Sequence, residues 1–303
     1  MPRLRRSNDA RASIGAMTNP PTVTDALASA LATVDSFGAS HASAAVVGPE
    51  GVVAAHGDLD HRFGWASVTK LVTGLAVLTA IEDGRIDLDE QAPVPAPPGA
   101  TIRHLLAHTS GLPFDGDAVQ GRPGTRRIYS NTGFDLLGAV LAQRDDRPFE
   151  TSLRDRVLMP LGMDGTVLLE RPSQGLHGPI RDLATFAGEL LRPTLISPDT
   201  LRAATQVVFE AMPGVLPGVG RFDILDWGLA FELRDGKEPH WTGTRNSPGT
   251  FGHFGGSGTF LWVDPALDVA LACLTDRTYG PWALETWPPF CDAVIVALNG
   301  PVD

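Results

Sequence analysis

The sequence has 303 residues, 43% of them hydrophobic, which is enough to bury a large core in one domain or in two closely packed ones. Its 24 basic and 35 acidic residues leave a formal charge of −11, which argues against a nucleic-acid-binding surface. No apolar run reaches the length of about 18 residues that a membrane-spanning helix needs, so we expect no membrane partner.

The N-terminal stretch has a basic start but lacks the apolar segment of a secretory signal. We therefore expect residues 1–21 to be a disordered tail, with Met17 as an alternative start, and the protein to be cytoplasmic. The two cysteines, Cys273 and Cys291, stand in apolar surroundings, and we expect both to be reduced core thiols.

The first half of the chain predicts a helix, a hairpin and then a buried helix. Residues 22–37 have helical spacing with a threonine available as a cap, and two short apolar runs flank a turn at 50–51. The stretch 67–81 is apolar on nearly every face, which is typical of a helix inside the protein, and we expect it to end at Asp83.

The rest of the chain predicts helices first and strands later. Proline-rich residues 91–100 predict a surface loop, and the glycine-rich and proline-rich segments 114–128 and 213–220 predict irregular structure. Helical spacing with proline or glycine boundaries predicts helices at 101–113, 130–144, 148–163, 179–193, 197–209 and 282–298. Runs rich in β-branched and aromatic residues predict antiparallel strands at 227–233, 250–256, 259–265 and 268–276.

This order of elements predicts an α+β fold, in which an antiparallel sheet is flanked by N- and C-terminal helices and carries an inserted helical lobe. We assign residues 22–66 and 223–303 to the sheet domain and 67–222 to the mainly helical domain. The active site is expected between the two.

Ser67 and Lys70 lie three residues apart, so their side chains share one face of the first helical turn. A serine hydroxyl attacks carbonyls only when a base takes its proton, and a lysine serves as that base when burial disfavours its charge. Lys70 is one of only two lysines among the 24 basic residues, and arginine cannot replace it as a base. The alternative is a serine at the N-terminus of the helix with a lysine that reaches the surface.

Two further stretches carry chemistry-bearing residues. Tyr129 is one of only two tyrosines and stands near Asn131 where a loop enters a helix; a phenol can relay a proton and an amide can hold a carbonyl. The alternative is a capping pair beside a half-buried tyrosine. His253 precedes Gly255 and Gly256 in the predicted sheet, and glycines there would let a substrate approach the strand closely. The alternative is a glycine-rich turn with a surface histidine.

Taken together, Ser67-x-x-Lys70, Tyr129-x-Asn131 and His253-x-Gly255 resemble the serine β-lactamase and penicillin-binding-protein superfamily, which has these three motifs in this order. Segments such as HLLAHTSGLP make the chain similar to the class C branch and its esterase relatives, and the resemblance covers residues from about 22 to 300.

The resemblance implies a role for each motif residue. Ser67 would be the acylated nucleophile, Lys70 its proton acceptor, and Tyr129 the second acid/base, which serves the leaving group. Asn131 would orient the substrate or Lys70. His253 would occupy the cationic position of the third motif, where most β-lactamases have lysine. The N–H groups of Gly256 and Ser67 would form the oxyanion hole.

Three other sets of residues have spacing or neighbours that bear on a site. His104 and His108 have the i, i+4 spacing of a zinc pair, but no third ligand is evident, so we expect packing and no metal. Trp65 stands close enough to Ser67 to line an acyl pocket. Lys237 is expected to be a solvated turn residue.

The sequence therefore predicts a cofactor-free serine hydrolase that acts through an acyl-enzyme on a small-molecule ester or amide, most simply a carboxylesterase. A D-alanyl carboxypeptidase or weak β-lactamase is the alternative enzyme, and a non-catalytic binding protein on the same fold is the alternative of another class. The oligomeric state is not predicted.

Overall fold

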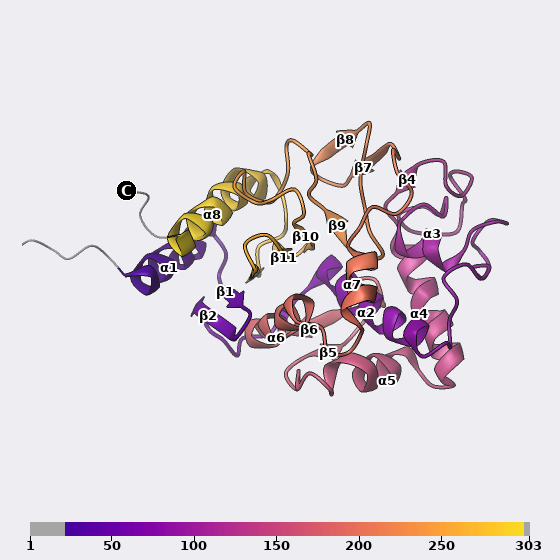
Figure 1. The fold of residues 1–303 in the computed structure, drawn as a ribbon, viewed down its shortest axis with the longest axis horizontal. Helices are drawn as coiled ribbons and strands as arrows, with labels where there is room; N and C mark the ends of the chain where they lie inside the picture. The colour runs from indigo at the N-terminus through magenta and orange to yellow at the C-terminus, as the bar shows by residue number, and fades with distance from the viewer. Residues whose placement is uncertain (1–21, 300–303) are drawn as a thin grey trace, which may run out of the picture.

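A six-stranded antiparallel sheet joins two distant parts of the chain in the computed structural model, which describes residues 22–299 (Figure 1). The predicted tail 1–21, with Met17, lies outside the described residues. In spatial order the strands are β2 (Gly51–His56), β1 (Ala42–Gly48), β12 (Val269–Thr275), β11 (Thr259–Asp264), β10 (Phe251–Gly255) and β9 (Glu232–Leu233). The early hairpin thus completes the sheet made by the late strands, as the order of elements predicts.

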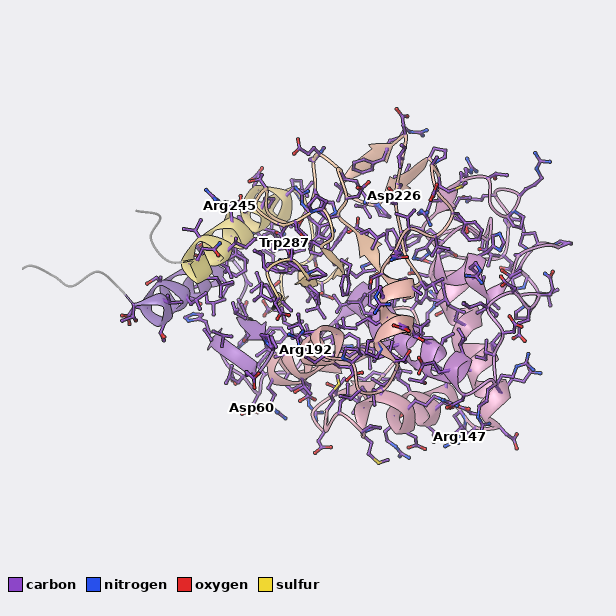
Figure 2. The ribbon with its side chains drawn as sticks, in the orientation of Figure 1. Asp60, Arg147, Arg192, Asp226, Arg245 and Trp287 are labelled. Carbon is purple, nitrogen blue, oxygen red and sulfur yellow. The ribbon has the colours of Figure 1, made fainter. Side chains whose placement is uncertain are left out.

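The two faces of this sheet are covered by different helices. Along β1, Ala44 and Val46 pack in one core cluster with α1 (Val23–Leu31) and α8 (Pro281–Asn299), whereas the alternate residues Ala45 and Val47 pack in the cluster that contains α6 (Ile180–Leu191). This split follows from the period of two along a strand. α1 and α8 lie side by side in Figure 1, and Trp287 of α8, labelled in Figure 2, is fully buried.

The predicted buried helix is confirmed as α2 (Thr69–Glu82). Every residue from Thr69 to Ala80 is buried, because α2 contacts α4 (Asn131–Asp145) and α5 (Phe149–Leu153) on one side and β10 of the sheet on the other. The sequence predicts Ser67 in the first turn of this helix. In the structure it lies instead in a 3₁₀ turn, Ala66–Val68, that leads into the helix. The site residue is therefore set between the sheet and the helices.

Several predicted elements are shorter than expected. The 148–163 segment forms α5 and then a π-helical turn, Arg154–Leu158, and the 227–233 segment forms only β9 and one isolated bridge. The remaining α-helices of the described residues are α3 (Ile102–Leu106) and α7 (Pro198–Ala204), and a 3₁₀ helix, Ala32–Phe37, continues α1. α4 begins as predicted after Ser130, whose Oγ accepts the N–H of Gly133 at 2.9 Å.

Two small sheets arise where the sequence predicted none. One consists of β3 (Phe63–Gly64), β6 (Leu176–Gly178) and β5 (Val167–Leu168). The other joins β4 (Arg127–Ile128), β7 (Gly214–Leu216) and β8 (Gly220–Phe222), which lie together in Figure 1. The second sheet draws together segments that glycine and proline had marked as irregular, because the pairing of β4 with β7 is non-local.

The prediction for Lys237 is wrong. Its side chain is buried, with Nζ 3.4 Å from Glu232 Oε1, because the turn at Asp235 (φ +47°) returns the lysine against β9. Both cysteines are buried and free, as expected. Within residues 22–299, no helix is long and apolar enough to cross a membrane.

Candidate active site

The turn that carries Ser67 has a strained backbone. Ala66, the residue before it, has a φ of +45°, a conformation that costs a residue with a side chain about 1–2 kcal/mol. The turn is held from two sides, because the Trp65 N–H donates to the Leu176 carbonyl at 2.8 Å and the Trp65 carbonyl accepts from Thr259 Oγ1 at 2.9 Å. Strain of this kind persists only where surrounding contacts enforce it.

Gly255 is what lets the sheet approach this turn. A Cβ placed on Gly255 would lie 2.5 Å from the Trp65 carbonyl oxygen and 3.1 Å from Ala66 Cβ. At Gly255 the close approach is therefore made by the turn of Ser67, whereas a Cβ on Gly256 would have nothing within 4 Å. Gly255 thus fixes the distance between β10 and the candidate nucleophile.

Lys70 lies fully buried beside Ser67. Its Nζ is 3.2 Å from Ser67 Oγ, 2.6 Å from Asn131 Oδ1 and 2.9 Å from the Ser173 carbonyl oxygen. No carboxylate of residues 22–299 is within 4.0 Å of this amine. Burial therefore lowers the pKa of Lys70 from 10.5 to about 7, although the charges of Asp135 and Asp115 act in the opposite direction.

The three partners of the amine decide which way its lone pair points. A neutral amine has two N–H donors and one lone pair. Asn131 Oδ1 and the Ser173 carbonyl can only accept, so they take the two N–H bonds. The lone pair of Lys70 then faces the hydroxyl of Ser67, which can donate. Asn131 is thus placed to orient Lys70, one of the two roles that the motif implied.

Tyr129 and His253 form a neutral pair on the other side of the serine. His253 Nδ1 donates to the Phe254 carbonyl at 2.6 Å, so its Nε2 accepts from the Tyr129 hydroxyl at 3.2 Å. Burial and the nearby charge of Lys70 lower the pKa of His253 to about 3, and burial raises the pKa of Tyr129 above its ordinary value. His253 therefore provides no fixed positive charge at the position where the third motif usually has one.

Two backbone donors face the same space as Ser67. In the described part of the chain, neither the Ser67 N–H nor the Gly256 N–H donates to an acceptor. Both residues line one pocket of about 180 Å³. This arrangement leaves both groups available to a carbonyl oxygen bound there.

That pocket is mostly apolar. Besides Ser67, Tyr129, His253 and Gly256, it is lined by residues that the sequence reasoning missed: Phe114, Leu216, Pro217, Gly218, Phe254 and Tyr279. One signal was present, because Tyr279 is the second of only two tyrosines, and both line the pocket.

Trp65 does not line this pocket, which corrects the expectation for it. Its ring is fully buried, and Nε1 donates to the Gly178 carbonyl at 3.0 Å, so the tryptophan supports the turn from behind.

The histidines at 104 and 108 are engaged separately. His104 bonds Thr101 Oγ1 at 2.8 Å, whereas His108 is buried, accepts the Ser130 N–H at 3.1 Å and lies with its ring centroid 4.6 Å from that of Tyr129. Among residues 22–299, no group of three potential metal ligands is present. His108 packs under the site, as predicted.

Comparisons with known proteins agree with the motifs. A β-lactamase structure from Mycobacterium bovis is 48% identical, with 88% of this chain and 98% of that chain covered and a TM-score of 0.85. EstCE1, described as a hydrolase with promiscuous acyltransferase activity, shares the fold with a TM-score of 0.74 at 18% identity, with 90% and 98% covered.

A curated relative, the D-alanyl-D-alanine-carboxypeptidase/endopeptidase AmpH of Escherichia coli K12, is 29% identical over 143 residues, which are 36% of this chain and 37% of AmpH. The chain thus spans little more than a third of that relative. The family model described as Beta-lactamase matches residues 32–290. The chain therefore belongs to the Beta-lactamase family.

Proposed function

We propose that the chain hydrolyses small carboxylic esters through an acyl-enzyme formed on Ser67. The observation that carries the proposal is the contact of 3.2 Å between Ser67 Oγ and the buried amine of Lys70, whose pKa of about 7 makes it a base near neutral pH. Among residues 22–299, the basic side chain that lines the pocket of Ser67 is His253, and its pKa of about 3 leaves it a weak base.

In the first half of the reaction, Ser67 Oγ attacks the ester carbonyl carbon and its proton passes to the lone pair of Lys70. The charge that forms on the carbonyl oxygen is stabilised by the N–H groups of Ser67 and Gly256. Lys70, now an ammonium ion, keeps hydrogen bonds to Asn131 Oδ1, to the Ser173 carbonyl and to the serine oxygen.

When the tetrahedral intermediate collapses, the bond to the leaving alkoxide breaks and Tyr129 supplies the proton that this group needs. Tyr129 is protonated at neutral pH, since burial raises its pKa, and its hydroxyl turns from His253 Nε2 to the leaving oxygen. It then regains a proton from the Lys70 ammonium, whose Nζ lies 4.8 Å from the centroid of the tyrosine ring. Water then attacks the acyl-serine, and its proton follows the reverse path, so that the carboxylic acid leaves and Ser67 is restored.

Two observations favour an ester over a carboxylate-bearing lactam. His253 is neutral, and its Nε2 already accepts from Tyr129, so it offers no cation to a drug carboxylate. The pocket beside Ser67 is also lined mainly by apolar side chains. A D-alanyl carboxypeptidase or weak β-lactamase is the second candidate, which the names of AmpH and the M. bovis protein favour.

The test compares the rate of hydrolysis of phenyl acetate with that of a chromogenic cephalosporin. We expect turnover of the ester, labelling of the wild type by an aryl phosphonate in the intact mass, and loss of both in Ser67→Ala with the fold retained. Faster cleavage of the cephalosporin would reverse the order of the two candidates. An unlabelled wild type without turnover would support a binding protein and refute the hydrolase.

A further inference from the structure

A second and larger pocket adjoins the pocket of Ser67. Its volume is about 480 Å³, and it shares Phe114, Tyr129 and Pro217 with the first. Tyr129 thus stands at the boundary between the two pockets. A substrate whose carbonyl is held at Ser67 would extend past the hydroxyl that serves its leaving group and into this second space.

The register of the β4–β7–β8 sheet places two arginines on the wall of the second pocket. Ile128 pairs with Val215, which pairs with Arg221, and Arg126 lies two residues before Ile128. Arg126 stands in the bend just before β4. All four residues line the pocket, so the pairing of β4, β7 and β8 brings Arg126 and Arg221 to it from distant parts of the chain.

The electrostatic environment of this pocket is positive. None of its lining residues is acidic, and neither Arg126 nor Arg221 has a carboxylate of residues 22–299 within 4.0 Å. By contrast, ten other arginines in that range form ion pairs. One guanidinium nitrogen of Arg126 donates to the Gln120 carbonyl at 2.6 Å, which leaves most of its N–H donors available.

A third arginine adds a buried charge beneath the pocket. The guanidinium of Arg127 is buried and bonds only backbone carbonyls in the described chain, namely those of Ala107, Leu225, Val208 and Phe209. Burial lowers the pKa of Arg127 to about 10, and the charge of Asp226 (labelled in Figure 2) acts in the opposite direction. In a chain of net charge −11, the positive charge that this pocket presents to a ligand is therefore that of the exposed Arg126 and Arg221.

We propose that the second pocket binds a carboxylate on the leaving group of the substrate, with Arg126 and Arg221 as its ligands. A guanidinium presents paired N–H donors that match the two oxygens of a carboxylate. The inference rests on the proposed ester hydrolysis and narrows its substrate class to esters of hydroxy acids. In this proposal the substrate carboxylate binds to the two arginines and not to His253.

The experiment compares 4-acetoxybenzoate with its neutral counterpart 4-acetoxybenzamide, by the absorbance of the released phenol. We expect kcat/KM at low salt to favour the carboxylate in the wild type. Arg126→Gln and Arg221→Gln should each lower the ratio of the two kcat/KM values about 3- to 10-fold, less than for a buried pair because both side chains are solvent-exposed. The matched control is Arg122→Gln, an exposed arginine that does not line this pocket, which should leave the ratio unchanged.

A second measurement tests carboxylate binding independently of the proposed ester hydrolysis. Binding of the product 4-hydroxybenzoate, measured by calorimetry with Ser67→Ala, should exceed that of 4-hydroxybenzamide and should weaken in Arg126→Gln and Arg221→Gln. Carboxylate binding without turnover of either ester would refute the hydrolase while supporting the subsite. If the wild type hydrolyses both esters with equal kcat/KM, or if neither glutamine variant changes the ratio of the two kcat/KM values, the carboxylate subsite is refuted while the hydrolase stands.

Discussion

The acylation rate should depend on pH through a single group, the amine of Lys70. With its ordinary pKa of 10.5, roughly one lysine in 3,000 would be neutral at pH 7, whereas a pKa of about 7 leaves about half in the base form. That difference corresponds to about 5 kcal/mol of disfavoured ammonium. Its physical source is desolvation, because the side chain has no exposed surface and no carboxylate partner in the described chain.

The other buried ionisable groups at the site have pKa values shifted away from the range near pH 7 in which Lys70 titrates. The pKa of His253 is about 3, that of His108 is lowered well below 6.5 by burial, and that of Tyr129 is raised above 10. We therefore expect kcat/KM for phenyl acetate to rise about tenfold per pH unit below about pH 6 and to level off above about pH 8. Initial rates from about pH 5 to 9 in constant ionic strength measure this profile.

The matched perturbation is Lys70→Arg, which keeps a cation but loses the removable proton. We expect kcat/KM at pH 8 to fall about 10³-fold, within the usual contribution of a general base, and the acid limb near pH 7 to disappear. Circular dichroism serves as the control for folding. A profile that is flat from about pH 5 to 8, or a limb that persists in the arginine variant, would refute Lys70 as the base.

Three further predictions concern the framework of the site. Gly255→Ala should lower the free energy of unfolding by about 1–3 kcal/mol and kcat/KM by at least about tenfold, because the new Cβ meets the turn of Ser67 at 2.5 Å; thermal unfolding and ester turnover measure this. Burial acts to raise the pKa of Glu232, but the charges of His240 and Lys237 outweigh it and lower this pKa from 4.5 to about 2. The ionised carboxylate therefore contributes about 3 kcal/mol to the free energy of unfolding above pH 4.5, and this contribution is lost as the pH falls toward 2. Urea unfolding at several pH values should show this acid loss in the wild type. Both thiols should be inert to a thiol reagent in the native state and reactive in denaturant, since both are buried.

Each of these predictions has a control. Gly256→Ala has nothing within 4 Å of its new Cβ, so its stability should stay within about 0.5 kcal/mol of the wild type, and an equal loss in both alanine variants would contradict the packing argument. Glu232→Gln should lack the steep acid loss, and an unchanged pH dependence would exclude that carboxylate as its source. Rapid native labelling of either cysteine would show that its part of the core opens.

The nucleophile and its base were predictable because their spacing is local. Ser67 and Lys70 lie within one turn of a segment so apolar that only a buried helix suits it, and burial is what makes the amine a candidate base. The start of α4 was predictable for the same reason, since a cap depends on its own few neighbours, and the structure shows that Ser130 is this cap. The predictions that failed depended on contacts that spacing does not show. Trp65 was misplaced because its Nε1 donates to the carbonyl of Gly178, far along the chain. Lys237 was misplaced although Glu232 is close to it in sequence, because its burial depends on how the turn at Asp235 folds back against β9.

The amino-acid sequence by itself predicted the α+β fold and contained the three motifs, because these depend on short-range spacing and on the period of the strands. The motifs carry the resemblance to the family. Only the tertiary structure decided the electrical state of the site and the shape of its pockets. About half of Lys70 is neutral at pH 7, and His253 is uncharged there, because of what surrounds them in space. Arg126 and Arg221 line one pocket because β4 pairs with β7 across more than eighty residues of chain. Charge and shape at a site are properties of contacts, and contacts between distant residues exist only once the chain has folded.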